Sequence, residues 1–322
     1  MNLEVDTVLA RRRLRRSRGL WRALAVAAVV VALVAIGAAG DRLSLALGGD
    51  QIARVSIEGT ITENRGQLKL LRQLAEAKNV KAVLVFVNSP GGTTTGGEAL
   101  FEALRDVAKK KPVVAQFGTI AASAGYIVGL GADHIVSRAN TITGSVGVLI
   151  QWPEVSQLLD NIGVKVNEIK SGPLKAVPSP FEPLNEEGKA VTRSMIDEGF
   201  RWFLSLVEER RGIKPDDIPA LAQGRVFTGR EAVELKLVDE IGGEDQALKW
   251  LHEKNNIDAS LTVVDWKPKS SSSLGLLSAA GAIAGGLLGD SEARLVRILG
   301  RDRSLSTLGL DGLVSVWHPS EN

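Results

Sequence analysis

The 322-residue sequence contains no cysteine and only three histidines, His134, His252 and His318. The missing cysteines exclude disulfide bonds, thiol catalysis, thiolate zinc sites and iron–sulfur clusters, although they say nothing about the compartment. With so few histidines, a multi-histidine metal centre is excluded, and a Ser-His-Asp triad has few candidates. Any chemistry must therefore come from other residue types, and we expect no metal and no cofactor.

Net positive charge is confined to the start of the chain. Residues 1–22 hold seven arginines against two acidic side chains, whereas the other residues carry a small net negative charge. A nucleic-acid groove needs clustered basic side chains to neutralise phosphates, so we expect no nucleic acid partner. The content of 44% hydrophobic and 24% charged residues excludes wholesale disorder.

One long apolar run, residues 23–40, follows this basic head and contains no charge. As a helix it would span about 27 Å, close to the thickness of a bilayer core. The preceding arginines predict a cytoplasmic head (1–22), a single-pass anchor in the cell (inner) membrane, and a body outside the cytoplasm. The alternative is a cleaved secretory signal, since small residues occur at Ala35, Gly37 and Ala39. The run is longer than a usual signal core, which favours the anchor.

After a linker (41–52), residues 53–266 alternate between strand and helix patterns, which predicts a layered α/β core with crossover connections. The expected strands are 53–59, 81–87, 112–118, one starting at residue 134, and 260–266. The expected helices are 67–77, 94–110, 121–131, 185–211, 229–236 and 244–254. Residues 267–322 are expected to form a flexible or membrane-interface tail, with a weak second membrane segment as the alternative.

Two motifs directly follow buried strands. In the first, NSPGG (88–92), glycines allow a sharp turn and leave amides that can hold an oxyanion or a phosphate. An ordinary glycine turn explains this fragment equally well, and its glycine spacing fits neither a Walker loop nor a dinucleotide fingerprint. In the second, GTIAASAGY (118–126), small neighbours leave the Ser123 hydroxyl accessible near a helix start. The alternative is a tightly packed helix in which Ser123 bonds a carbonyl.

A nucleophilic serine would need a base. His134 stands at the entry of a strand and is expected at the surface. A lysine can serve where an apolar setting keeps its amine neutral, and Lys175 has apolar neighbours in sequence. Lys170 is nearby but has Glu168 two residues away. Taken alone, either lysine is more simply a solvated surface charge.

At this point the sequence resembles the bacterial signal peptide peptidase A family, in its short membrane-anchored form. The matching segments occur in family order across residues 53–255, and the anchor matches as well. They are VNSPGG (87–92), GTIAASAGY (118–126), TITGSVGV (141–148), IKSGPLK (169–175) with SP at 179–180, and GRVFTGREAVELKLVDEIGG (224–243). The resemblance implies a serine protease with a Ser/Lys dyad, on a fold similar to the Clp protease and crotonase folds.

The resemblance also implies a role for particular residues. Ser123 would be the nucleophile and Lys175 the general base, with Gly92 donating an oxyanion-hole amide and Ser145 orienting the lysine amine. Ala124 stands where relatives usually carry glycine, and its methyl is expected to narrow the substrate cleft. The implied substrates are hydrophobic peptides, notably signal peptide remnants. The implied assembly is a homo-oligomeric ring or dome in membrane lipid, with active sites shared between subunits.

Two other functions stay open from the residues alone. A crotonase-fold acyl-CoA enzyme would use the same oxyanion amides on a thioester, but an extracytoplasmic body would not meet coenzyme A. A catalytically inactive membrane scaffold would bind peptides without cleaving them, and the presence of both Ser123 and Lys175 argues against it.

Overall fold

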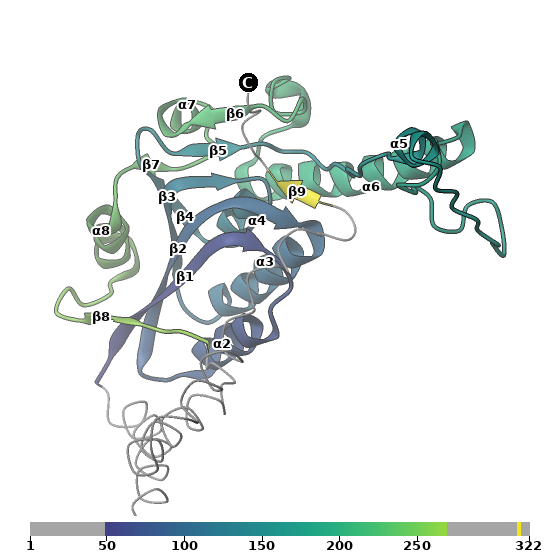
Figure 1. Cartoon of the computed structure of the whole chain (residues 1–322). Helices are drawn as coiled ribbons and strands as arrows, with labels where there is room; N and C mark the ends of the chain where they lie inside the picture. Colours follow the sequence, from purple (N-terminus) through teal and green to yellow (C-terminus); the bar gives the residue numbers. More distant parts are fainter. Residues whose placement is uncertain (1–48, 269–313, 317–322) are drawn as a thin grey trace, which may run out of the picture. The chain divides into compact units, whose positions relative to one another are not determined.

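The computed structural model describes residues 49–268 and 314–316. In these residues the chain forms one nine-stranded sheet, whose main path runs β6-β5-β3-β2-β1-β8 (Figure 1). β4 pairs with β3, β7 with β4, and β9 with β2. The strands are β1 (Gln51–Ile61), β2 (Val80–Thr93), β3 (Val113–Ala122), β4 (His134–Ser137), β5 (Ile142–Gly144), β6 (Val226–Thr228), β7 (Glu240–Ile241), β8 (Thr262–Asp265) and β9 (Val314–Val316).

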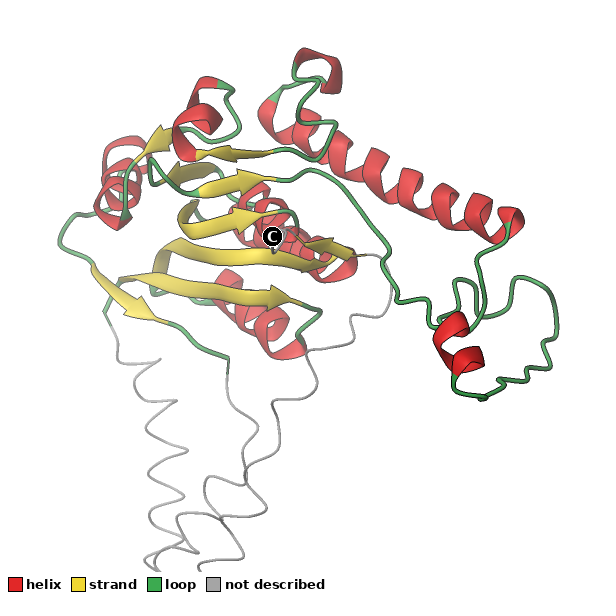
Figure 2. Cartoon of the chain, turned by 45° about the horizontal axis from the view of Figure 1, so that its top comes forward, coloured by secondary structure: helices red, strands yellow, loops and turns green. Residues whose placement is uncertain are grey.

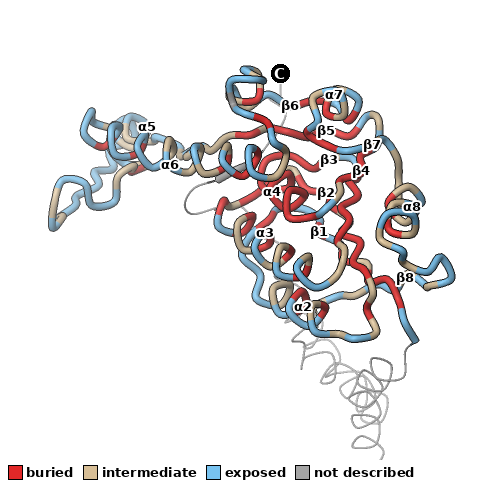
Figure 3. The backbone as a smooth tube through the Cα atoms, turned by 180° about the vertical axis from the view of Figure 1, so that it is seen from behind, coloured by how far each residue is buried: buried red, intermediate tan, exposed pale blue. Residues whose placement is uncertain are grey.

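Helices cover both faces of the central strands, which explains why those strands are almost continuously apolar. α2 (Arg65–Glu76), α3 (Thr94–Ala108) and α4 (Ala124–Leu130) cover one face and share a buried core with side chains such as Val85. α8 (Glu244–Asn255) covers part of the other face, where Ala247 and Leu251 pack with Leu84. Figure 3 shows that burial is concentrated in the sheet and the helix sides facing it.

A long helix extends from this layered body. α6 (Glu186–Arg211) buries Phe203 and Val207 in the core with its second half, and α6 contacts α4. Its first half projects away from the sheet together with α5 (Ser156–Asn161) and the segment between them (Figure 2). We call residues 149–195 the arm. Two further helical elements, η1 (Pro215–Asp217) and α7 (Gly229–Glu234), follow α6.

The layered α/β core predicted over residues 53–266 is confirmed, but the ends of two strands differ from the prediction. The NSPGG segment was expected as a glycine turn. It instead continues β2, because Gly91 and Gly92 pair with Thr60 and Ile61 of β1. β3 likewise runs on to Ala122, so that α4 starts only at Ala124. Both extensions carry the chain directly into the region of the predicted catalytic residues.

The predicted membrane anchor, residues 23–40, lies outside the described residues. Among those that are described, no helix combines the length and the apolar character needed to cross a bilayer. Most of the predicted tail also lies outside the described residues. Three of its residues form β9, which pairs antiparallel with Gly91–Thr93 of β2.

Candidate active site

Ser123 lies at the sharp junction between β3 and α4. Its backbone has φ 59° and ψ −121°, a conformation that non-glycine residues rarely adopt. Ser123 is only 1% exposed, and its amide donates a 2.9 Å hydrogen bond to the Gly144 carbonyl of β5. Strain of this kind persists only where the surrounding structure holds it, and it concentrates at functional sites. The geometry therefore supports Ser123 as a reactive residue.

Close packing on both sides fixes this junction. A Cβ added at Gly125 would lie 2.8 Å from the Ser89 carbonyl oxygen, so the start of α4 lies directly against β2. Tyr126 is fully buried, and its hydroxyl donates to the Leu237 carbonyl at 2.8 Å. Burial raises the pKa of Tyr126, which keeps the phenol protonated as the donor.

The side chain of Ala124 is buried between α4 and α3. Ala124 is fully buried, and a Cβ added at Gly97 of α3 would lie 3.2 Å from the Ala124 Cβ. The methyl group therefore occupies space that Gly97 leaves open. Within the chain the methyl packs between α3 and α4, and its expected effect on a substrate cleft stays a prediction.

Gly92 occupies a position in β2 where no side chain fits. A Cβ at this residue would lie 1.8 Å from the Ile61 carbonyl oxygen, far inside contact distance. Gly92 follows Ser89, which pairs with Ala121 two residues before Ser123. The Gly92 backbone is thus at the same end of the sheet as Ser123, as an oxyanion donor must be.

Asn88 and Ser89, two members of the NSPGG motif to which the sequence analysis gave no role of their own, maintain this end of β2. The β2–β3 register shifts between Val87 and Ser89, which interrupts the regular ladder. There the Asn88 Oδ1 accepts from the amides of Thr119 and Ile120 at 3.1 and 3.3 Å. The buried Ser89 Oγ donates to the Gly59 carbonyl at 2.6 Å and accepts from the Gly91 amide at 3.1 Å. The signal available in the sequence was a polar pair interrupting a buried apolar strand.

Ser145 lies on the other side of Ser123, at the end of β5. Ala122 pairs with Gly144, so Ser145 is the next residue beyond the β3–β5 ladder. Its backbone has φ 51°, and its amide donates to the Arg225 carbonyl at 2.9 Å. Two residues earlier, the buried Thr143 hydroxyl donates to the Ala121 carbonyl at 2.7 Å. The structure thus brings Gly92, Ser123 and Ser145 to one end of three strands.

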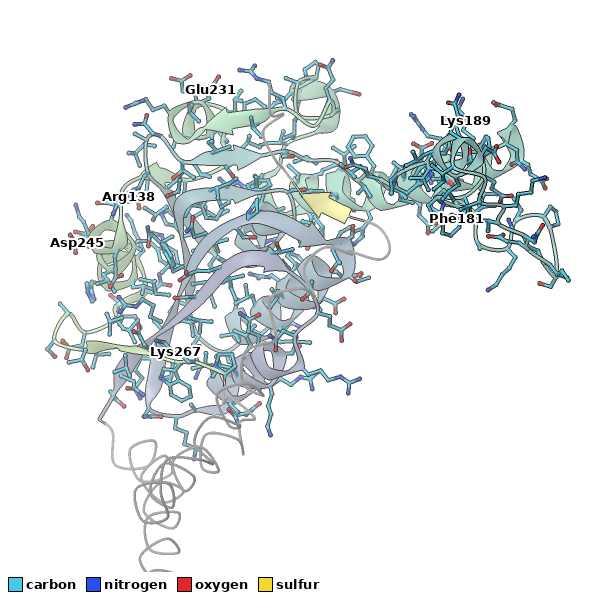
Figure 4. The ribbon with its side chains drawn as sticks, in the orientation of Figure 1. Arg138, Phe181, Lys189, Glu231, Asp245 and Lys267 are labelled. Carbon is cyan, nitrogen blue, oxygen red and sulfur yellow. The ribbon has the colours of Figure 1, made fainter. Side chains whose placement is uncertain are left out.

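Lys175 is not part of this cluster within one chain. It is exposed and lies in the arm between α5 and α6, where its amide donates to the Gly172 carbonyl at 3.1 Å. The segment between these helices lies at the outer end of the arm, away from the β3–α4 junction (Figures 1 and 2). Phe181, labelled in Figure 4, lies in the same segment. A single chain therefore keeps the predicted base apart from the predicted nucleophile.

The two other candidate bases are occupied elsewhere. Lys170 bonds Glu182 and Glu168, and these two carboxylates raise the pKa of its amine, so Lys170 is a charged group. His134 pairs with Val114 near the start of β3, far along the strand from Ser123. Its ring bonds Glu240 at 2.8 Å and stacks on Trp250. Neither residue is placed to activate Ser123.

A cavity of about 810 Å³ lies away from this cluster. It lies on the sheet face that carries α8, and its lining includes Arg54, Glu58 and Asn88 but none of the four predicted site residues. Arg54 is paired with Glu244 at 2.8 Å and Asp265 at 2.6 Å. Arg138 and Lys267, which also line it, are labelled on this side of the body in Figure 4.

In the described part of the chain, no cluster of three acidic or histidine side chains is placed to hold a metal ion.

Comparison with known proteins agrees with this geometry. Residues 52–151, which contain all but the first residue of β1 and all of β2 to β5, match the Clp protease family, and residues 105–258 match peptidase family S49. A Synechocystis protein named as a candidate protease is 35% identical over 217 residues, covering 67% of this chain and 78% of the relative. An Enterococcus faecium protein named as a candidate signal peptide peptidase is 34% identical, covering 67% of each chain. An Arabidopsis thaliana chloroplastic serine protease is 29% identical over 74% of this chain and 38% of its own length.

These matches and the fold place the chain among proteases of the Clp-like α/β class. More narrowly, the chain belongs to peptidase family S49 and is similar to the signal peptide peptidase A proteins within it. The resemblance stated from the sequence motifs is confirmed at this level.

Proposed function

We propose that the protein is a membrane-anchored serine endopeptidase that uses Ser123 as nucleophile and Lys175 as general base. The observation that carries this proposal is the strained, buried backbone of Ser123, next to Ser145 and at the same sheet end as Gly92. Membership of a serine protease family gives the reaction type. The roles proposed for the individual residues come from the motifs shared with that family, and the positions of Gly92 and Ser145 near Ser123 support two of them.

The proposed reaction has two stages. The neutral amine of Lys175 takes the proton of Ser123 Oγ as the oxygen attacks the peptide carbonyl carbon. The carbonyl oxygen becomes an oxyanion, which the Gly92 amide stabilises by hydrogen bonding. Lys175 then returns the proton to the leaving amine, and an acyl-enzyme forms on Ser123. Water, deprotonated by the same lysine, releases the acyl group and restores both residues.

Because one chain holds Lys175 away from Ser123, we propose that the base comes from a neighbouring copy. The arm supports this pairing, since all but two of the large exposed hydrophobic side chains in the described residues belong to it. They are Leu149, Leu158, Ile162, Val164, Val166, Ile169, Leu174, Phe181, Val191 and Met195. The arm thus carries both Lys175 and an exposed apolar surface. We propose that it packs on the next subunit and supplies the lysine of that subunit's active site.

The proposed substrates are hydrophobic peptides such as cleaved signal peptides. Two features support this class: the apolar run over residues 23–40, which would keep the enzyme at the membrane, and the name of the Enterococcus relative. Repeated packing of arms would produce a ring or dome, which would keep folded proteins away from the sites.

A fluorophosphonate probe tests the nucleophile. The full-length protein should be labelled at Ser123, because the probe reacts with an activated serine. Ser123→Ala should abolish the labelling, whereas the control Ser260→Ala, at an exposed position between α8 and β8, should leave it unchanged. Labelling that persists in Ser123→Ala, or that is absent from the assembled parent protein, would remove Ser123 from the mechanism.

A protection assay tests the anchor. Protease added to intact spheroplasts should digest the body, because residues 41–322 are proposed to lie outside the cytoplasm. A body that stays protected, while a lysed control is cut, would show the opposite topology.

A further inference from the structure

One motif that carries the family resemblance, GRVFTGRE (224–231), has no part in the proposed reaction. It forms β6 and the start of α7, beside β5 (Figure 1). β6 pairs antiparallel with β5 as far as Val226 with Gly144. One residue beyond this ladder, the Ser145 amide donates to the Arg225 carbonyl at 2.9 Å. The motif therefore lies directly against the strand that leads to Ser145.

Gly144 and Ser145 form a backbone turn that depends on support from outside. Their φ angles are 84° and 51°, so two consecutive residues have left-handed backbone. For a non-glycine residue such as Ser145, this conformation persists only where neighbouring groups hold it. The Gly144 carbonyl in turn accepts the 2.9 Å hydrogen bond from the Ser123 amide. The position of these two residues therefore affects both the proposed nucleophile and the hydroxyl proposed to orient the lysine.

The ring of Phe227 provides support at Gly144. A Cβ added at Gly144 would lie 2.7 Å from Cδ2 of this ring, so the ring packs directly on the glycine α-carbon. Phe227 is only 2% exposed and belongs to the main core of the body. Because a close-packed interior leaves little room for movement, the ring limits how far Gly144 and the adjoining Ser145 can shift.

The side chain of Arg225 covers the Phe227 ring. Its Cζ lies 5.1 Å from the ring centroid, within the range of a cation–π contact. The guanidinium is also paired at 2.7 Å with Glu231 of α7, which is labelled in Figure 4. The other oxygen of that carboxylate accepts from the amide and the hydroxyl of Thr228. Because the Arg225 side chain is about half exposed, these contacts contribute little to the stability of the whole body.

We propose that Phe227 and Arg225 are positioning residues for the active site. The ring holds Gly144, and the guanidinium holds the ring. Together they keep Ser123 and the Ser145 hydroxyl in place for proton transfer to the lysine. This inference rests on the proposed protease function, because it uses the roles proposed there for the two serines. It adds that a segment outside the catalytic set controls the geometry of that set.

Removal of the ring tests this role by kinetics. Phe227→Leu keeps an apolar side chain in the core but leaves Gly144 without the ring. It should lower kcat about tenfold and change KM less than about twofold, because a misplaced proton-transfer group slows the reaction without weakening substrate binding. Phe101→Leu, which removes a buried ring from α3, is the matched control and should keep the parental kcat. An unchanged kcat in Phe227→Leu, or an equal fall in Phe101→Leu, would overturn the proposal.

Arg225 gives a second test that leaves the core unchanged. Arg225→Gln removes the cation over the ring but keeps the backbone carbonyl that Ser145 uses. It should lower kcat about threefold, and Arg225→Lys, which keeps a cation, should recover most of this loss. Lys110→Gln breaks an exposed ion pair with Glu76 and should keep the parental kcat. Equal kcat values for Arg225→Gln and Arg225→Lys would overturn the role of the guanidinium.

A measurement without turnover separates this inference from the catalytic one. Amide hydrogen exchange is followed in the full-length parent and in Arg225→Gln. The Ser145 amide should exchange about threefold faster in the variant, whereas the Val83 amide, which donates to the Pro112 carbonyl, should exchange at nearly the same rate in both. That result with no hydrolysis by the parent would contradict the protease function while supporting the positioning role. Hydrolysis by the parent with equal Ser145 exchange in both proteins would overturn the positioning role alone.

Discussion

The oxyanion role of Gly92 can be tested only by a change that adds no atoms to its α-carbon. A Cβ here would lie 1.8 Å from the Ile61 carbonyl oxygen, so both Gly92→Ala and Gly92→Pro would force β1 and β2 apart. A backbone ester at position 92 instead replaces the amide N–H by oxygen and keeps the glycine geometry. Loss of an oxyanion donor should lower kcat by about 10²–10³, or about 2.7–4 kcal/mol of transition-state stabilisation.

This loss is distinguishable from a loss of stability. One missing backbone hydrogen bond costs about 0.5–1.5 kcal/mol, and a domain with about 5–15 kcal/mol of stability stays folded after such a change. The matched control is an ester at Gly66, whose amide donates to the Asn64 side chain at the start of α2. The Gly66 ester should lower the free energy of unfolding by a similar amount and leave kcat unchanged. The assay is steady-state hydrolysis of a peptide substrate, with folding checked by circular dichroism. A folded Gly92 ester with kcat within about threefold of the parent would refute the assignment.

Two further substitutions test the proposed base and the Tyr126 hydrogen bond that holds α4 in place. Lys175→Arg should abolish peptide hydrolysis, because arginine keeps its proton at working pH, whereas Lys170→Arg should stay active because Lys170 serves as a charged partner of Glu168 and Glu182. Near-parental turnover in Lys175→Arg would exclude this lysine. Tyr126→Phe should lower the free energy of unfolding by about 1–3 kcal/mol in urea, because the buried Leu237 carbonyl loses its donor. The exposed Ser205→Ala should change it by less than about 0.5 kcal/mol, and equal effects of both changes would contradict the packing argument.

The elements that the sequence predicted well are those with strong apolar patterns. The strand expected over 81–87 and the helix over 94–110 correspond to β2 and α3, because continuous burial and helical spacing leave a clear signal. Ser123 and the NSPGG segment stood out as candidates because small residues and glycines follow such strands. Here local pattern and tertiary packing agree.

The elements that the sequence missed depend on contacts between distant segments. The NSPGG segment reads as a turn because it contains proline and glycines, but pairing with Thr60 and Ile61 extends it as a strand. β5, β6 and β7 have two or three residues each, too few for a periodic signal. β9 exists only through pairing with β2, and the serine-rich and glycine-rich residues before it suggested no strand. The separation of Lys175 from Ser123 likewise depends on the direction of α6 rather than on any local pattern.

The most direct test of a site shared between copies is complementation between two inactive variants. Ser123→Ala and Lys175→Ala are coexpressed with different affinity tags, and mixed oligomers are isolated through both tags. If each site pairs Ser123 of one copy with Lys175 of the next, about a quarter of the interfaces in a random equimolar mixture join two intact residues. The account predicts that peptide hydrolysis returns to about a quarter of the parental rate per site, while each variant alone stays inactive. Verified mixed oligomers that remain inactive would contradict the shared site.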